Sequence, residues 1–156
     1  MAGKLQTEIK QKRAFPSLEA EAFLNLQRTA DSLMRGMTET LKPAGLSPAQ
    51  YNVLRILRGA GRDGLACRQV GDRMVTKDPD MTRLLDRLEA RGLIARSREQ
   101  KDRRVITTRI TEEGLRLLKD LDGPVAELHE RQLGHLRAER LRSLIELLEA
   151  ARAKAR

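Results

Sequence analysis

Basic side chains are concentrated in one short segment of the chain, residues 93–110. The segment holds six cations against two acids, Glu99 and Asp102; the cations are Arg96, Arg98, Lys101, Arg103, Arg104 and Arg109. Guanidinium and ammonium groups bind phosphate oxygens, and each such contact releases a condensed counterion from a polyanion. The chemistry indicated is recognition of phosphate. A charged hairpin that is merely solvated is the plainer interpretation of the same residues.

The whole chain is basic and helix-prone. Its 156 residues carry a net charge of +9 with a pI of about 10.4, and 40% are hydrophobic but only 2% aromatic. The core must therefore be aliphatic, and the Leu, Ala, Glu and Arg bias favours helices. The charge fits a nucleic acid, although composition alone would also fit an anionic membrane surface.

The cellular compartment can be inferred from the absence of a cysteine pair, a signal peptide and a membrane span in the sequence. One cysteine, Cys67, rules out an intramolecular disulfide and favours a reducing compartment. The N-terminus has no apolar core of a signal peptide, and no apolar stretch approaches the roughly 18 residues of a membrane span. We therefore expect a soluble, cytoplasmic protein without a membrane partner.

No catalytic pattern is present. The sequence has no Walker loop, dinucleotide glycine fingerprint or G-x-S-x-G elbow. His129 and His135 are not four residues apart on a helix, and no second cysteine completes a zinc site. We expect no enzyme activity, no cofactor and no metal.

The elements before the basic segment can be located from capping residues. A helix beginning near Ser17 carries a heptad-like apolar seam that calls for a partner, and Pro43 and Gly45 end it. The seam comprises Phe23, Leu26, Ala30, Leu33, Met37 and Leu41. A second helix starts at Ser47, whose hydroxyl and Gln50 form a capping box, and runs to the break at residues 59–61.

Two shorter helices follow. The first runs from about Cys67 to Val75. For the second, Asp78 precedes a proline and is predicted as the N-cap, with Pro79 at the first helical position and Gly92 at the end. Its apolar stripe must face the protein body; the stripe is Met81, Leu84, Leu85 and Leu88.

The period then changes to that of strands. Residues 93–98 and 103–110 are predicted strands joined by a turn at 99–102. Thr111 caps the next helix, in which Gly123-Pro124 should produce a kink or a split, and a last helix starts near Arg137.

Two short helices followed by a hairpin are typical of a winged helix-turn-helix, whose second helix enters the major groove of DNA while the hairpin reaches an adjacent minor groove. A helical wheel places Pro79, Arg83, Asp86 and Ala90 opposite the apolar stripe, with Thr82 and Arg87 at the flanks. Arg83 is the best candidate for a base contact, because its guanidinium can donate two hydrogen bonds to guanine. The bland alternative is a surface ion pair of Arg83 with Asp80 or Asp86.

Four segments in the expected order resemble the MarR family of dimeric bacterial regulators. They are LSPAQYNVL at 46–54, TRLLDRLEARGLI at 82–94, DRR at 102–104 and ITEEG at 110–114. The resemblance covers roughly residues 17–152. It implies a mainly α fold with a small β-hairpin wing, that is, a winged helix-turn-helix with N- and C-terminal dimerisation helices.

The resemblance also implies a domain plan. Residues 1–16 would be a flexible basic arm, 17–45 and 111–156 a helical dimerisation region, and 46–110 the DNA-binding domain. The implied function is a transcriptional regulator that binds duplex DNA as a homodimer, represses from a pseudo-palindromic operator and is relieved by a small phenolic or anionic effector.

Specific roles follow for individual residues. The DNA contacts are expected from Lys77, Pro79, Asp80, Thr82, Arg83, Arg87, Arg98, Lys101, Arg103 and Arg104. The resemblance implies that Asp86 pairs with Arg104 to hold the wing, whose tip is Asp102 to Arg104. Tyr51 is expected in the core, with a hydroxyl that could line an effector pocket.

Two alternatives remain at this stage. One is a helical interaction module that binds RNA or an acidic protein through the basic hairpin. The other is a thiol-based redox sensor that uses Cys67, which begins a helix beside Arg68.

The sequence departs from the family pattern at two places. Ala66 stands where a hydroxyl residue usually caps the first helix of the motif. Asp78 and Asp80 place carboxylates near phosphate, so either Asp80 accepts a hydrogen bond from a cytosine amino group or this helix end stands away from the DNA backbone.

Overall fold

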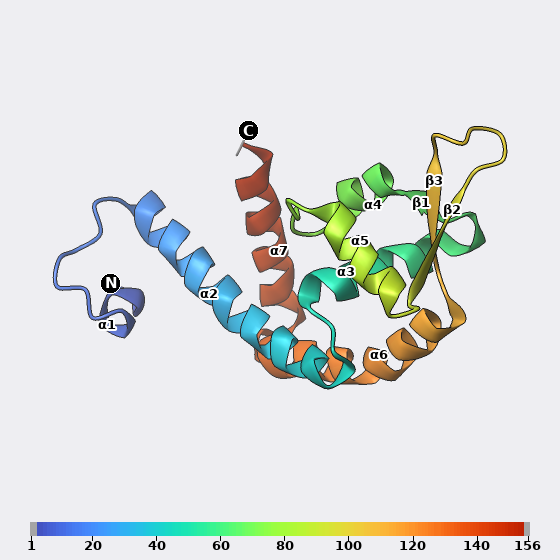
Figure 1. Cartoon of the computed structure of the whole chain (residues 1–156). Helices are drawn as coiled ribbons and strands as arrows, with labels where there is room; N and C mark the ends of the chain where they lie inside the picture. Colours follow the sequence, from blue (N-terminus) through green and yellow to red (C-terminus); the bar gives the residue numbers. More distant parts are fainter. Residues whose placement is uncertain (1–2, 155–156) are drawn as a thin grey trace. The chain divides into compact units, whose positions relative to one another are not determined.

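The computed structural model describes residues 3–154 (Figure 1), which divide into two compact units between Gly36 and Met37. The first unit holds α1 (Leu5–Glu8) and most of α2 (Leu18–Leu41). Leu5 is only 3% exposed, and a 3.2 Å ion pair joins Arg28 of α2 to Glu8 of α1. The segment predicted as a flexible basic arm contains one helical turn at Leu5–Glu8, which the burial of Leu5 and this ion pair hold in place.

The boundaries of α2 follow local capping chemistry. At its start, the hydroxyl oxygen of Ser17 accepts a hydrogen bond from the Ala20 N–H. At its end, a 3-10 turn (η1, Lys42–Ala44) leads to Gly45, whose φ of +68° lies in the left-handed region that glycine adopts most easily. The predicted end of the helix at Pro43 and Gly45 is confirmed.

The second unit contains the remaining elements. In chain order they are α3 (Pro48–Ala60), η2 (Gly61–Asp63), β1 (Leu65–Ala66), α4 (Cys67–Arg73), α5 (Met81–Ala90), β2 (Ile94–Arg98), β3 (Ile106–Ile110), α6 (Glu112–Leu133), η3 (Gly134–Leu136) and α7 (Arg137–Ala153). This order confirms the mainly α fold with a hairpin wing. No helix within residues 3–154 is long and apolar enough to cross a membrane.

The predicted capping box opens α3. The Ser47 hydroxyl oxygen accepts from the Gln50 N–H at 3.1 Å, and the Gln50 side-chain oxygen accepts from the Ser47 N–H at 3.0 Å. At α4 only half of such a box exists, because Ala66 has no side-chain acceptor; the Gln69 side chain accepts from the Ala66 N–H at 2.9 Å.

The hairpin strands belong to a three-stranded antiparallel sheet in the order β1-β3-β2. Leu65 lies opposite Thr108, and Ile94 lies opposite Ile110. Strand β1 was not predicted, because two residues are too short to show a period. The Gly64 that precedes it has a φ of +64°, and a Cβ there would lie 2.5 Å from the Thr108 carbonyl oxygen, so only glycine fits.

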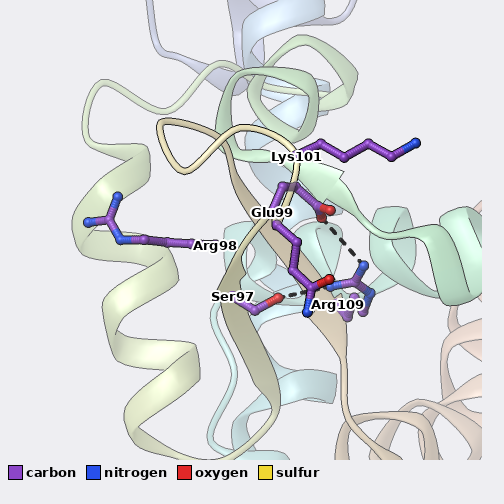
Figure 2. A pocket seen from close by; sticks show the side chains of 6 residues that line it. Ser97, Arg98, Glu99, Lys101 and Arg109 are labelled. Carbon is purple, nitrogen blue, oxygen red and sulfur yellow. Dashed lines mark hydrogen bonds and ion pairs between the residues drawn. The ribbon is translucent and has the colours of Figure 1, made fainter.

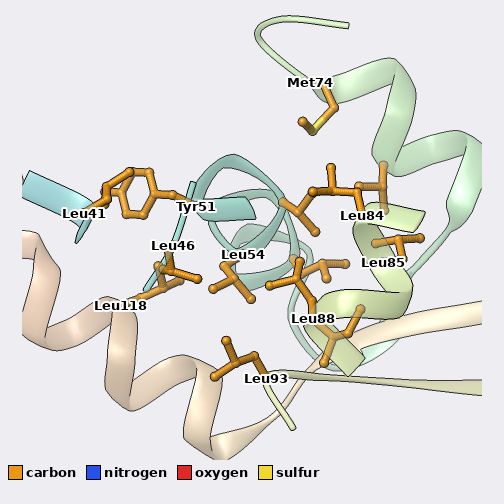
Figure 3. Close-up of a cluster of buried hydrophobic side chains, with 14 of the residues drawn as sticks. Leu41, Leu46, Tyr51, Leu54, Met74, Leu84, Leu85, Leu88, Leu93 and Leu118 are labelled. Carbon is orange, nitrogen blue, oxygen red and sulfur yellow. The ribbon is translucent and has the colours of Figure 1, made fainter. Parts of the chain in front are cut away.

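The core of the second unit is aliphatic, as the composition indicated. Side chains from α3, α5 and α6 meet in this core, with Leu54, Leu88 and Leu118 fully buried (Figure 3). A bidentate pair adds to this packing, because Arg58 of α3 donates to both carboxylate oxygens of Asp122 of α6 at 3.0 and 3.1 Å. Helix α3 is thereby fixed to α6.

Helix α6 runs without a break through Gly123-Pro124, so a split at this site is wrong. Proline removes one backbone hydrogen bond from a helix. Here Pro124 is exposed, while Leu121, Val125 and Leu128 are buried on the opposite face on both sides of it. Their packing keeps the two halves of the helix in one element.

Candidate nucleic-acid interface

Helix α5 starts two residues later than predicted. Its N-cap is Asp80, whose carboxylate accepts from the Arg83 N–H at 3.1 Å. Asp78 instead accepts from the Asp80 N–H at 2.8 Å and shapes the turn before the helix, with Pro79 outside the helix. The prediction of Asp78 as the N-cap and Pro79 as the first helical residue is wrong. Either aspartate could serve as an N-cap, and Asp80, which directly precedes Met81, takes the position.

The two faces of α5 are divided as the helical wheel predicted. Leu84, Leu85 and Leu88 are buried. The outward side chains are exposed; they are Thr82, Arg83, Asp86, Arg87 and Ala90. A helix with an exposed polar face can enter the major groove, where its side chains would reach the base edges.

Arg96 of β2 joins α5 to the wing. Its guanidinium donates to Asp86 at 2.5 Å and to Glu89 at 2.9 Å, and its backbone N–H donates to Glu89 at 3.1 Å. The Arg96 side chain is only 23% exposed. These hydrogen bonds hold the pKa of Glu89 below its usual value and raise that of Arg96.

The pairing of Asp86 with Arg104 that the family resemblance implied is wrong for this chain. Arg104 pairs with its neighbour Asp102, with its Nε at 3.2 Å, and is 92% exposed. Arg104 lies in the turn at the far end of the hairpin, whereas Arg96 lies within β2 beside α5. Sequence reasoning missed Arg96, although two acids three residues apart on one helix face, Asp86 and Glu89, are a signal for a shared cation.

Asp102 is nevertheless a structural residue of the wing turn. Besides the Arg104 side chain, it accepts the Arg104 backbone N–H at 3.0 Å, and these hydrogen bonds lower the pKa of Asp102. Its own carbonyl oxygen accepts from the Val105 N–H at 3.0 Å. The turn is therefore closed by side-chain and backbone contacts.

The base of the wing is held by Arg109. Its Nε donates to the Arg62 carbonyl oxygen at 2.8 Å and its NH1 to the Ser97 hydroxyl oxygen at 3.1 Å, with Glu99 at 3.6 Å. Figure 2 shows these side chains around an open hollow, with Arg98 on one side of the hairpin and Lys101 extended on the other. Like Arg96, Arg109 is thus used to build the wing.

Four cations of the hairpin remain on its surface: Arg98, Lys101, Arg103 and Arg104. Arg98 also donates to the Arg103 carbonyl oxygen at 2.8 Å, which fixes its position. These four are the hairpin residues predicted to contact phosphate. The structure thereby separates the wing cations that build the hairpin from those that present charge to solvent.

A second arginine fixes the far end of α5. Arg91, which follows the helix, donates to the Gly45 carbonyl oxygen at 2.7 Å and to the Ala44 carbonyl oxygen at 3.0 Å. Both acceptors belong to the connection between α2 and α3. The C-terminal end of α5 is therefore attached to the connection between α2 and α3.

The other predicted residues lie in three separate places. Lys77 is exposed in the turn before α5. Tyr51 is 7% exposed in the core of α3, and its hydroxyl accepts from Arg55 at 3.3 Å. Cys67 is half-buried at the start of α4. The effector role of Tyr51 and the redox role of Cys67 stay predictions.

Comparison with known proteins identifies the family. A family model described as the MarR family matches residues 44–105. The Bacillus subtilis transcriptional regulator MhqR is 30% identical over 127 residues, which are 81% of this chain and 86% of MhqR. The B. subtilis transcriptional repressor MdtR is 37% identical over 97 residues, 62% of this chain and 61% of MdtR.

A solved structure agrees with these relatives. The crystal structure of a MarR transcription factor from Planctomyces limnophilus is 47% identical and superimposes with a TM-score of 0.68, covering 88% of this chain and 99% of that one. The relatives are transcriptional regulators, and their likeness extends over both the helix-turn-helix and the wing. The chain belongs to the MarR family of DNA-binding, winged helix-turn-helix transcriptional regulators.

Proposed function

We propose that the chain is a homodimeric repressor that binds a pseudo-palindromic operator, with half-sites about one helical turn of DNA apart. One observation carries this proposal: Arg96 binds Asp86 and Glu89 and so holds the wing against α5. The exposed face of α5 and the wing therefore form one DNA-binding lobe of the second unit. A lobe built in this way can place a helix in one groove and a basic hairpin in the next. Family membership supports the same mode of binding.

Base recognition is assigned to the N-terminal half of α5. Arg83 is exposed and lies in the first turn of the helix, where a guanidinium can reach guanine O6 and N7. Thr82 and Arg87 flank it, and Lys77 and Pro79 precede the helix. Asp80 uses one carboxylate oxygen, Oδ1, for capping, and the other oxygen is assigned to a cytosine amino group.

The exposed cations of the wing, Arg98, Lys101, Arg103 and Arg104, are assigned to phosphates. Their charge is presented on a narrow hairpin. Arg109 and Arg96 hold the base of this hairpin through their hydrogen bonds to the Arg62 carbonyl oxygen and to Asp86. Phosphate contacts give affinity for any duplex and a steep dependence on salt, whereas base contacts give preference for one sequence.

The homodimer is supported by apolar side chains that each unit leaves exposed. In α7, Ile145 is 52% and Leu147 is 69% exposed, and in the first unit Leu18 is 80% and Phe23 is 63% exposed. Large apolar side chains repeated along terminal helices mark an interface that another chain covers. Pairing with a second copy of this chain would give the protein two-fold symmetry, which is why a two-fold symmetric operator is expected.

Repression and relief complete the proposal. The relative MdtR is a transcriptional repressor. Relief by a small phenolic or anionic effector would need a cation near an aromatic wall. Tyr51 and Arg55 offer that pair, since the Arg55 guanidinium lies 5.9 Å from the centre of the Tyr51 ring.

Selection of bound sequences from a random duplex pool tests the proposal directly. We expect an enriched site with two-fold symmetry, a dimer by light scattering, and tighter binding to duplex than to single strands or RNA. Arg83→Ala should relax the preference at one position of each half-site, whereas Arg104→Ala should weaken all sequences and reduce the salt slope. Equal binding of RNA and duplex would favour the interaction-module alternative, and binding lost on peroxide treatment would favour the thiol sensor.

A further inference from the structure

One apolar side chain stands almost fully in solvent within the turn that leads to α5. Val75 is 90% exposed, although the residue before it, Met74, is only 9% exposed. The rest of the turn is polar or charged apart from Pro79, and includes Thr76 and Lys77. A branched aliphatic side chain in such surroundings adds nothing to the packing of its own lobe.

The backbone of Val75 is fixed. Its N–H donates to the side-chain oxygen of Asn52 on α3 at 2.8 Å. This bond crosses 23 residues of sequence and ties the turn to the helix beneath it. Valine has a single, stiff side-chain torsion. The isopropyl group is therefore presented at a set position with little conformational entropy to lose on contact.

We propose that Val75 is a specificity-determining residue that contacts the C5-methyl group of a thymine in each operator half-site, with Asn52 as its positioning residue. This inference rests on the proposed function, because it assumes that the start of α5 enters the major groove. In that groove the thymine methyl is the apolar feature of the base edges, and small apolar side chains are what recognise it.

A thymine methyl group is a better partner for the exposed Val75 side chain than a protein surface is. The exposed apolar area here is one side chain set among Thr76, Lys77 and the Asp78 turn, which is far smaller than an apolar patch that docks a protein. A lysine two residues from Val75 suits a phosphate next to the contacted base. The same turn can then hold the DNA backbone and sense one methyl group.

The test replaces each thymine of the selected operator with deoxyuridine, one symmetric pair at a time, which removes only the methyl groups. Burial of one methyl corresponds to about fourfold in affinity, so about fifteenfold is expected when both half-sites are changed. Wild type should show this loss at one symmetric pair. Val75→Ala lacks the two methyl groups with which valine reaches the base, so it should bind the thymine operator more weakly and show a much smaller further loss at that pair.

Val105→Ala is the matched control, because Val105 is also an exposed valine of the same lobe, at 39%, but lies in the wing. It should keep the deoxyuridine effect. Asn52→Asp retains an acceptor oxygen and should keep the effect as well, whereas Asn52→Ala should reduce it. Circular dichroism establishes that each variant is folded before binding is compared.

The proposal is overturned if no pair of thymines shows a methyl effect, or if Val75→Ala responds to deoxyuridine as wild type does. Either result would leave duplex binding by the wild-type dimer intact. Failure of the proposed function is a different observation, namely that wild type selects no duplex sequence at all. The two outcomes are therefore distinguishable within one set of measurements.

Discussion

Replacing Arg96 with glutamine removes the cation that Asp86 and Glu89 share. Glutamine keeps much of the stem and a hydrogen-bond donor but not the charge. The variant therefore tests whether the link between α5 and the wing is electrostatic. We expect the free energy of unfolding to fall by about 2 kcal/mol, from the following contributions.

A hydrogen bond to a charged group contributes about 1.5–3 kcal/mol when it is shielded from water, and an exposed ion pair about 0.2–1 kcal/mol. Arg96 is 23% exposed, but the side chains of Asp86 and Glu89 are 55% and 40% exposed. Each contact should therefore lie near the boundary of the two ranges, at about 1 kcal/mol. The two acids left behind are three residues apart on α5 and repel each other slightly.

The assay is urea unfolding at one fixed protein concentration, because a dimer's stability depends on concentration. Hydrogen exchange of the β2 and β3 amides should show faster opening of the wing in the same variant. Arg104→Gln is the matched control. It removes the same charge from the same hairpin, but Arg104 is 92% exposed and pairs only within the turn, so it should leave the free energy of unfolding close to that of the wild type.

The two variants should also differ in DNA binding. Arg104→Gln should lose affinity with unchanged stability, whereas Arg96→Gln should lose both, since the wing is no longer held against α5. A loss of less than about 0.5 kcal/mol for Arg96→Gln would refute the argument. An equal loss of stability in both variants would refute it too, because the position of the charge would then not matter.

Three further predictions concern a buried hydroxyl, an exposed apolar side chain and an ion pair. Thr108 is 0% exposed and its hydroxyl has no hydrogen-bond partner within residues 3–154, so Thr108→Val should raise the free energy of unfolding by about 1 kcal/mol. Thr107→Val removes a hydroxyl that does donate to a carboxylate and should lower the free energy of unfolding. If both variants shift the urea midpoint in the same direction, this prediction is contradicted. Leu147→Asp should shift the dimer to monomer in light scattering, while Leu147→Met should not; a dimer that survives the aspartate at micromolar concentration places the interface elsewhere. Arg58 lowers the pKa of Asp122 below its ordinary value of 3.8, so the pair's contribution to the free energy of unfolding is complete above about pH 4 and is lost as the pH falls through the lowered pKa. Between pH 6 and 2 the urea midpoint should fall less for Asp122→Asn than for wild type. Parallel plots of midpoint against pH would show that the pair contributes nothing.

Elements whose ends depend on adjacent residues could be predicted from the sequence. The Ser47 and Gln50 capping box, the Thr111 cap and the glycine at position 45 all act within a few residues of the helix end they define. The start of α5 was harder, because Asp78 and Asp80 both satisfy the rules for an N-cap. Only the three-dimensional turn decides that Asp80 takes the position.

Features that depend on contacts distant in the sequence could not be predicted in this way. Strand β1 is two residues long and exists only because Leu65 and Ala66 pair with β3. For the candidate site, the exposed face of α5 followed from its period, but the partner of Asp86 did not. Which arginine of the hairpin reaches it depends on the distance of each from the helix.

The two attachments of α5 constrain how an effector could act. The helix is joined to β2 by Arg96 along its length and bound through Arg91 to the carbonyl groups of Ala44 and Gly45 at its C-terminal end. A helix held at these two points cannot turn about its own axis without breaking charged hydrogen bonds. A signal that separates the two lobes of a dimer would therefore change how far apart the half-sites must be, while the preferred bases within each half-site stay the same.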